Sequence, residues 1–220
     1  MKAISVPFSL ILVAMFTTTQ TGAVDPEQLA RFIGSIQCPR CDLSEFDFSQ
    51  FGSDINFNKA NLHQANLSKA NFSATNLSGA KLYGSDLRWA IFHKTDLRGA
   101  DLTKTYSKLA NFNLANLRGA RLINSDFRKA NLSETDLREA DMTGSNLSGS
   151  NLSEADLRGA NLSKVDLTRA DLTGANLTGA DMTGADLSLA EIKYANIKGA
   201  VLCKTTMPWG EENTNCKSFD

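Results

Sequence analysis

The stretch NLSEADLRGANLSKVDLTRADLTGANLTGADMTGA, residues 151–185, repeats one five-residue pattern seven times. In each unit a small residue lies two positions before a central apolar residue, Asn or Asp lies one position before it, and Ser, Thr or Arg follows it. The period runs from Ile55 to Leu202, and Ser107 is the single centre from Phe57 onward that is not apolar. A repeat this regular indicates a solenoid built from stacked units.

The period of five predicts a corner in every unit. Strand-like alternation sends the small residue and the central residue to one side and their neighbours to the other, but five is odd, so the phase must be reset once per unit. Between Ala60 and Ala200 the small position holds nothing larger than Val165. We therefore expect the small and central residues to point into a narrow interior.

Longer spacings indicate how many sides a coil has. Phe72, Phe92 and Phe112 recur every twenty residues, which stacks them if four units make one turn. The A(D/N)LXX pattern resembles the pentapeptide-repeat family, and the resemblance covers about two thirds of the chain. It implies an all-β fold, a right-handed quadrilateral β-helix over residues 38–206. At about 4.8 Å per coil the rod would be on the order of 36 Å long.

The first 23 residues are typical of a secretory signal peptide, because Lys2 precedes an apolar run over 4–16 and small residues follow at 21–23. We expect an exported protein beginning near Val24 and not inserted in a membrane after cleavage, with an uncleaved anchor as the alternative. Residues 24–37, opening with Asp25 and Pro26, predict a short amphipathic α-helix that caps the N-terminal end. Residues 207–220 leave the repeat and predict a C-terminal cap.

The first coil is irregular. Units centred on Leu43 and Phe48 carry the motif, but Phe48 and Phe57 are nine residues apart where two units require ten. The sequence therefore suggests a one-residue deletion around residues 51–54.

Four cysteines in an exported chain suggest two disulfides. Pairing Cys38 with Cys41 and Cys203 with Cys216 is favoured, because the two groups lie at opposite ends of the expected rod, too far apart for a bond between them. The same separation excludes one four-cysteine zinc site. Cys38 and Cys41 also form a CxxC, so a thiol redox site or half a metal site stays open beside the structural disulfide.

The regions around these cysteines resemble the termini of exported pentapeptide-repeat proteins common in cyanobacteria. That resemblance implies the periplasm or the thylakoid lumen, with the extracellular space as a further possibility.

No catalytic, cofactor or metal site is expected. The aspartates recur in outward columns set by the repeat, and a filled rod has no concave site in which carboxylates could converge. His63 and His93 are thirty residues apart, one and a half coils, so they lie on opposite faces.

Two charged columns are candidates for anion or acidic-partner binding. The first contains Arg98, Arg118, Arg138 and Arg158, and the second, on the opposite face, contains Arg88, Lys108 and Arg128. The alternative is a surface ladder whose charge is offset by aspartates two residues earlier. A third column, Lys81, Asp101, Arg121 and Asp141, alternates in sign and predicts a salt-bridge ladder.

An exposed apolar patch is also expected. Trp89 and Leu109 occupy outward corners one coil apart, while Ile91 and Tyr106 replace the usual Asn or Asp beside them. Such a patch indicates a partner or dimer contact. The alternative is a bulge near Ser107 that covers its own surface.

These features favour a non-enzymatic exported scaffold that displays side-chain ladders and binds an unknown protein partner or itself. A thiol redox protein using Cys38 and Cys41 is one alternative. The family resemblance supplies another, a DNA mimic that binds a topoisomerase, but removal of Lys2 leaves the mature chain at a net charge of only about −2 and nucleic acid is not an expected partner. Ice or mineral binding is not favoured, because Thr168, Thr173, Thr178 and Thr183 run around one coil rather than down a face.

Overall fold

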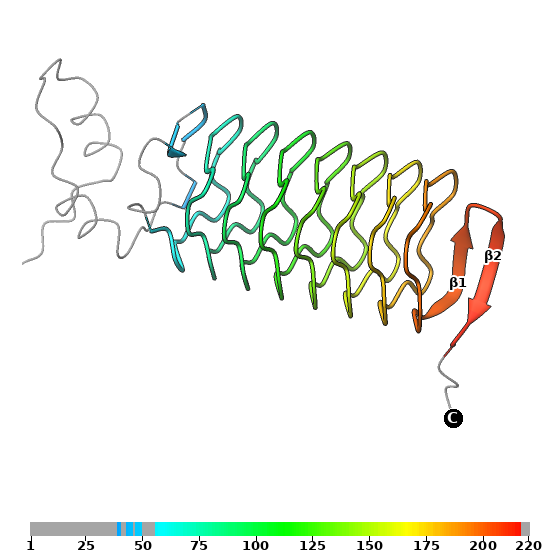
Figure 1. Cartoon of the computed structure of the whole chain (residues 1–220). Helices are drawn as coiled ribbons and strands as arrows, with labels where there is room; N and C mark the ends of the chain where they lie inside the picture. Colours follow the sequence, from blue (N-terminus) through cyan, green and yellow to red (C-terminus); the bar gives the residue numbers. More distant parts are fainter. Residues whose placement is uncertain (1–38, 41–42, 46, 50–55, 217–220) are drawn as a thin grey trace, which may run out of the picture.

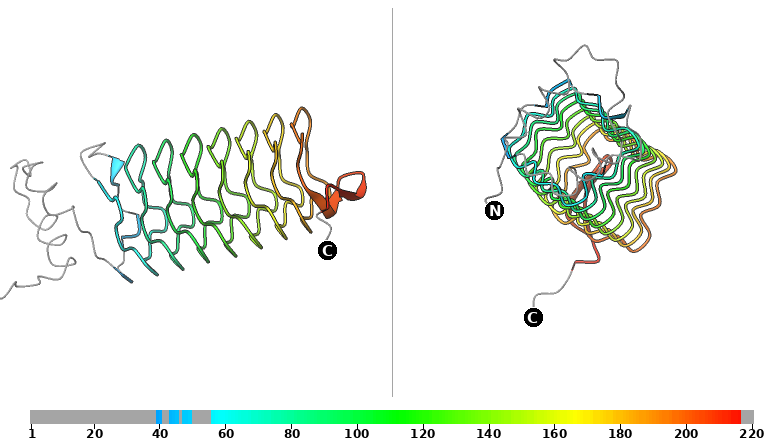
Figure 2. Two further views of the ribbon diagram at one scale, coloured as in Figure 1. Left: turned by 90° about the horizontal axis from the view of Figure 1, so that it is seen from below. Right: turned by 90° about the vertical axis from the view of Figure 1, so that its left-hand side faces the viewer.

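The computed structural model describes residues 39–40, 43–45, 47–49 and 56–216. The expected signal peptide, the expected capping helix, Cys38 and Cys41 lie outside these residues and stay predictions. From Asn56 onward the chain winds into a rod of stacked coils (Figure 1), and a view along the axis shows four flat sides (Figure 2).

Each corner is a hydrogen-bonded turn. The N–H of the small residue donates to the carbonyl of the preceding centre, as from Ala160 to Leu157 at 3.0 Å. The residue just before the small one has a positive φ, +65° at Gly159, and this conformation recurs every five residues from Lys59 to Lys204. A positive φ at the third residue of a four-residue turn is the signature of type II. The turn resets the strand alternation, so every unit presents the same face to the interior.

Consecutive coils are joined by parallel bridges between residues twenty apart, such as Asp136 with Asp156. On each side the N–H of the centre donates to the coil above, as from Leu157 to the carbonyl of Asn176 at 2.8 Å. The N–H of the preceding residue donates to the coil below, as from Asp156 to Thr135 at 3.0 Å. This ladder confirms the twenty-residue coil expected from the phenylalanine spacing.

The interior consists of the central and small residues, as expected. Phe48, Phe72, Phe92 and Phe112 form one stack of rings, with centroids separated by 4.6, 5.3 and 4.7 Å along the series. Burying one such side chain stabilises the folded state by about 1.5 to 3 kcal/mol. The stack therefore ties each coil to the next on that side of the rod.

Hydroxyls at the small position are buried and hydrogen-bonded to the backbone, which offsets the loss of their hydration. The Thr95 hydroxyl donates to the carbonyl of Phe72 at 2.7 Å, and the Ser85 hydroxyl donates to that of Leu62 at the same distance. These bonds explain why Ser and Thr share this position with Ala.

The structure corrects the expected deletion in the first coil. Phe48 donates its N–H to the carbonyl of Asn71 and stacks on Phe72, twenty-four residues ahead, whereas Phe57 donates to Asn76 with the normal offset. Phe48 and Phe57 therefore occupy adjacent units of the coil, with four residues between them in excess of the regular repeat. A spacing of nine residues fits two interpretations, two five-residue units with one residue deleted or one unit with four residues inserted. The residue count alone therefore could not distinguish a deletion from an insertion.

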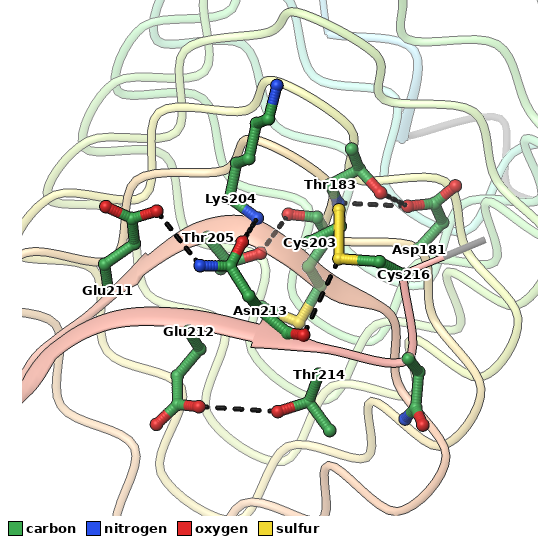
Figure 3. Close-up of a disulfide and its surroundings, with 12 residues drawn as sticks. Asp181, Thr183, Cys203, Lys204, Thr205, Glu211, Glu212, Asn213, Thr214 and Cys216 are labelled. Atoms are coloured by element: carbon green, nitrogen blue, oxygen red, sulfur yellow. Dashed lines mark hydrogen bonds between the residues drawn. A yellow bond between two sulfur atoms is a disulfide. The ribbon is translucent and has the colours of Figure 1, made fainter. Parts of the chain in front are cut away.

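The C-terminal end carries an antiparallel hairpin of β1 (Leu202–Met207) and β2 (Gly210–Thr214). Strand β1 is also the last side of the β-helix, because Thr206 bridges to Asp186 and accepts the N–H of Leu187. A disulfide joins Cys203 to Cys216, with Cα atoms 4.9 Å apart, and the Lys204 N–H donates to Asn213 (Figure 3). Within the described residues no helix has the length and apolar character needed to cross a membrane.

Replacing Ala160, which is buried, by Leu should overpack the interior and lower the free energy of unfolding by about 1 to 3 kcal/mol. The control is Ser163→Lys, at an outward position where Arg and Lys occur in other units, and it should change little. Urea unfolding of both variants measures the difference. Equal tolerance would contradict the assignment of the two positions to the inside and the outside.

Reducing the Cys203–Cys216 disulfide should loosen the C-terminal hairpin and the coil beneath it first, because the bond closes the segment that caps them. Hydrogen exchange, measured before and after reduction, should show faster exchange in 185–214 and unchanged exchange in the middle coils. A uniform change along the rod would argue against this local role.

Candidate interaction surface

Trp89 and Leu109 lie at corner positions where the backbone favours glycine. Their φ values are +59° and +62°, and glycine occupies eleven equivalent turns elsewhere in the rod. The side chains point away from the interior and are 49% and 40% exposed. Bulky residues are uncommon in this conformation, so the turn itself gives no reason for a Trp or a Leu here.

Tyr106 lies in the same coil as Leu109, at the position normally held by Asn or Asp. In the coil below, Asp86 accepts the backbone N–H of Arg88 at 3.1 Å, and this short contact recurs along the rod. A tyrosine cannot make it, and the Tyr106 ring instead lies 58% exposed on the side of the rod. Ile91, which replaces the same residue type next to Trp89, is half-buried.

The backbone stays regular through this region. Tyr106 bridges to Asp86 below and to Asp126 above, and the Leu109 N–H donates to Arg128 at 3.1 Å. Ser107 is fully buried and its hydroxyl donates to Thr105 at 3.2 Å. The alternative of a bulge that covers the patch is therefore wrong, and the apolar side chains stand on an undistorted coil.

A shallow groove of about 510 Å³ runs along this side of the rod, across four coils. Tyr106 and Lys108 come from its middle, and amides, two acids and two arginines complete it. The lining residues are Gln64, Ala65, Asn66, Gly84, Asp86, Arg88, Tyr106, Lys108, Asp126 and Arg128. We call Trp89, Ile91, Tyr106 and Leu109 the apolar corner, and the groove lies directly beside it.

Charges in the groove are mostly paired within their own strand. Arg128 binds both carboxylate oxygens of Asp126, at 2.8 and 2.6 Å, and Arg88 binds Asp86 in the same way. The hydrogen bond from Arg128 lowers the pKa of Asp126, partial burial opposes this, and Lys108 adds to the lowering. Arg88 and Arg128 each have an aspartate two residues earlier, whereas Lys108 has Tyr106 at that position. Lys108 forms no ion pair among the described residues.

The arginine column on the opposite face is paired as well. Arg98, Arg138 and Arg158 each bind the aspartate two residues earlier at 2.6 Å. Arg118 follows Asn116 instead and reaches Glu139 of the next coil at 2.8 Å. The alternative of an offset ladder describes this column better than a free anion-binding stripe.

The expected salt-bridge ladder in the alternating column is wrong. Among the described residues, Lys81, Asp101, Arg121 and Asp141 form no ion pairs with one another, although they are bridged in register. Asp101 accepts the N–H of Thr103 at 3.0 Å, and Asp141 accepts that of Thr143 at 3.1 Å. The aspartate side chains are short and accept hydrogen bonds from the backbone of their own turns, so they do not reach the cations of the next coil.

His63 and His93 are one and a half coils apart, so they lie on opposite sides of the rod. The ring of His63 stacks on that of Tyr83, with centroids 4.8 Å apart. In the part of the chain that the structure describes, no three His, Cys, Asp or Glu side chains gather in a way that could hold a metal ion.

The family model described as "Pentapeptide repeats" matches in eight copies, over residues 55–93, 70–106, 110–149, 150–188 and 170–207. This chain belongs to the pentapeptide-repeat family. Membership of this family implies a right-handed β-helix solenoid, which agrees with the coils described above.

Solved structures of other pentapeptide-repeat proteins resemble this one. HetL, involved in heterocyst differentiation regulation in Nostoc sp. strain PCC 7120, is 30% identical over 80% of this chain and 92% of its own, with a TM-score of 0.30. QnrB1, a plasmid-mediated fluoroquinolone resistance protein, is 18% identical over 84% of this chain and 93% of its own, with a TM-score of 0.55, and shows the fold alone. A thylakoid lumen protein of Arabidopsis thaliana is 27% identical over 61% and 66%, with a TM-score of 0.18. No curated protein matches this pentapeptide-repeat chain.

The paired aspartates predict acid-sensitive stability. In Asp136 the hydrogen bond from Arg138 lowers the pKa, partial burial opposes it, and the folded value lies below the ordinary one. The carboxylate therefore stabilises the fold fully above the unfolded pKa of about 3.9, and this contribution is lost as pH falls through the lower folded pKa. Thermal unfolding of Asp136→Asn should show a lower Tm at pH 7 and a smaller decrease below pH 4 than the wild type. Parallel pH profiles would mean that the pair contributes nothing measurable.

Proposed function

We propose that this pentapeptide-repeat protein is a non-enzymatic exported scaffold that binds a protein partner through the apolar corner and the adjoining groove. The observation that carries the proposal is the pair of large apolar residues, Trp89 and Leu109, at the same corner of two successive, undistorted coils. Trp and Tyr are enriched at protein interfaces, where their large rings contribute much of the binding energy. The groove adds polar groups around this apolar centre.

The electrostatics of the groove indicate the chemistry of the partner. Its two arginines are held by aspartates, whereas Lys108 forms no ion pair among the described residues and lines the groove together with the exposed Tyr106 ring. A partner segment with an apolar side chain for the corner and a carboxylate for Lys108 would satisfy both.

Export is inferred from the predicted signal peptide over 1–23 and is supported by the Cys203–Cys216 disulfide, which suits an oxidising compartment. The periplasm, the thylakoid lumen and the extracellular space all meet this condition. A redox role for Cys38 and Cys41 stays a separate hypothesis, because both residues lie outside the described part of the chain.

Mimicry of DNA is not favoured. The full chain has a net charge of −1, and five outward aspartates, Asp86, Asp96, Asp126, Asp136 and Asp156, are each bound by an arginine of the same strand. A DNA-like surface requires unpaired negative charge at regular intervals.

The test is affinity capture from the native exported compartment with the mature oxidised protein. A partner that binds the wild type should be lost with Trp89→Ser/Leu109→Ser and weakened with Lys108→Gln. Two controls should retain it: Leu114→Ser, which changes an exposed leucine at the next corner, and Arg118→Gln/Arg138→Gln on the opposite face. Loss with the arginine variant alone would move the site to that face, and retention by every variant would overturn the proposal.

A further inference from the structure

The C-terminal end of the rod is stepped. Strand β1 covers the half of the last full coil that contains Met182 and Leu187, and β2 adds a second layer beyond it (Figure 1). The other half, residues 189–199, has no described layer above it. We call residues 189–199 the uncovered edge.

The backbone of the uncovered edge has unused hydrogen-bond donors. In the coil below, the N–H groups of Leu172, Gly174 and Leu177 donate to the next coil at 2.7 to 2.9 Å. The equivalent donors one coil later belong to Ile192, Tyr194 and Ile197, and none of them finds an acceptor among the described residues. An open edge of this kind is a template for another strand.

The same half-coil exposes side chains that are buried everywhere else in the rod. The centres Ile192 and Ile197 and the small residue Ala195 are half-buried, whereas the corresponding residues of earlier coils are almost fully buried. Leu189 and Tyr194 at the adjoining corners are 70% and 78% exposed. This end is therefore an apolar surface bounded by peptide N–H groups that have no acceptor in the described part of the chain.

Strand β2 is the matching element. Among the described residues it pairs with β1 along one edge only and its second edge has no strand partner, and all of its residues except Glu212 are exposed. The hairpin is two strands high on one half of the end, and the other half lacks two layers. A two-fold rotation about an axis perpendicular to the rod would bring a second copy end to end with the first. The β2 edge of the second copy would then lie on the uncovered edge of the first, and the β2 edge of the first would lie on the uncovered edge of the second.

Charges agree with this arrangement. The uncovered edge carries Lys193 and Lys198 against Glu191, a net charge of +1. The hairpin carries Glu211 and Glu212 against Lys204, a net charge of −1. The two-fold rotation brings each positive half against a negative half, so the contact is complementary in both places where it occurs.

We propose that two copies of this chain associate through their C-terminal ends, with the β2 edge of each copy pairing with the uncovered edge of the other. The contact buries Ile192, Ile197 and Tyr194 and supplies acceptors for the free N–H groups. It joins two rods into one of double length and leaves the apolar corner accessible on both.

Sedimentation of the mature oxidised protein at micromolar concentrations tests the proposal by measuring its oligomeric state. The wild type should be a dimer. The charge reversals Lys193→Glu/Lys198→Glu and Glu211→Lys/Glu212→Lys should each raise the dimer dissociation constant at least about tenfold. Mixing the two variants should restore the dimer, because every contact in the mixed species is again complementary. Trp89→Ser/Leu109→Ser, which changes the other surface, should dimerise like the wild type.

Hydrogen exchange gives a second readout that does not depend on charge. The amides of Ile192, Tyr194 and Ile197 should be protected in the dimer and should exchange faster on dilution. A monomeric wild type, or a dimer that neither charge reversal weakens, would overturn the proposal. A monomer in which these amides are protected would also overturn it, and would show that the chain covers its own edge.

Discussion

The hydrogen-bond ladder between residues twenty apart is the interaction on which the rest of the structure depends. It requires every coil to contain the same number of residues and to turn its corners at the same places, which the type II turn provides once per unit. Given that ladder, the choice of interior residue is restricted by the distance to the coil above and below. Between Ala60 and Ala200 the small position holds only Ala, Ser, Thr and one Val, because a larger side chain would overpack the interior.

The sequence predicted the features that the period controls, because each repeated unit tests the same interpretation again. The inward residues, the twenty-residue coil and the phenylalanine stack follow from spacing alone. Features that depend on one local choice were harder to predict. The nine residues from Phe48 to Phe57 fit two readings, and only the partners of Phe48 show which applies. The alternating column has the charge pattern of a salt-bridge ladder, but Asp101 and Asp141 accept hydrogen bonds within their own turns.

The candidate site shows the same division. The exposure of Trp89, Leu109 and Tyr106 could be predicted, because the repeat directs the side chains at these positions outward whatever residue occupies them. The groove could not, because it depends on how Arg88 and Arg128 fold back onto their aspartates and leave space around Lys108. The uncovered edge could not be predicted either, since the sequence indicates only that residues 207–220 form a cap, whereas β1 and β2 cover half of the end.

The pairing of arginine and aspartate within single strands also affects how the rod meets other molecules. Opposite charges about 3 Å apart cancel at distances beyond the Debye length, roughly 8 Å at physiological ionic strength, so these columns add little to the field far from the surface. Partners are then not steered from a distance, and encounter rates stay near those of uncharged surfaces and change little with salt. Recognition by such a rod depends on contact, and its selectivity resides in the lifetime of a complex more than in the speed of its formation.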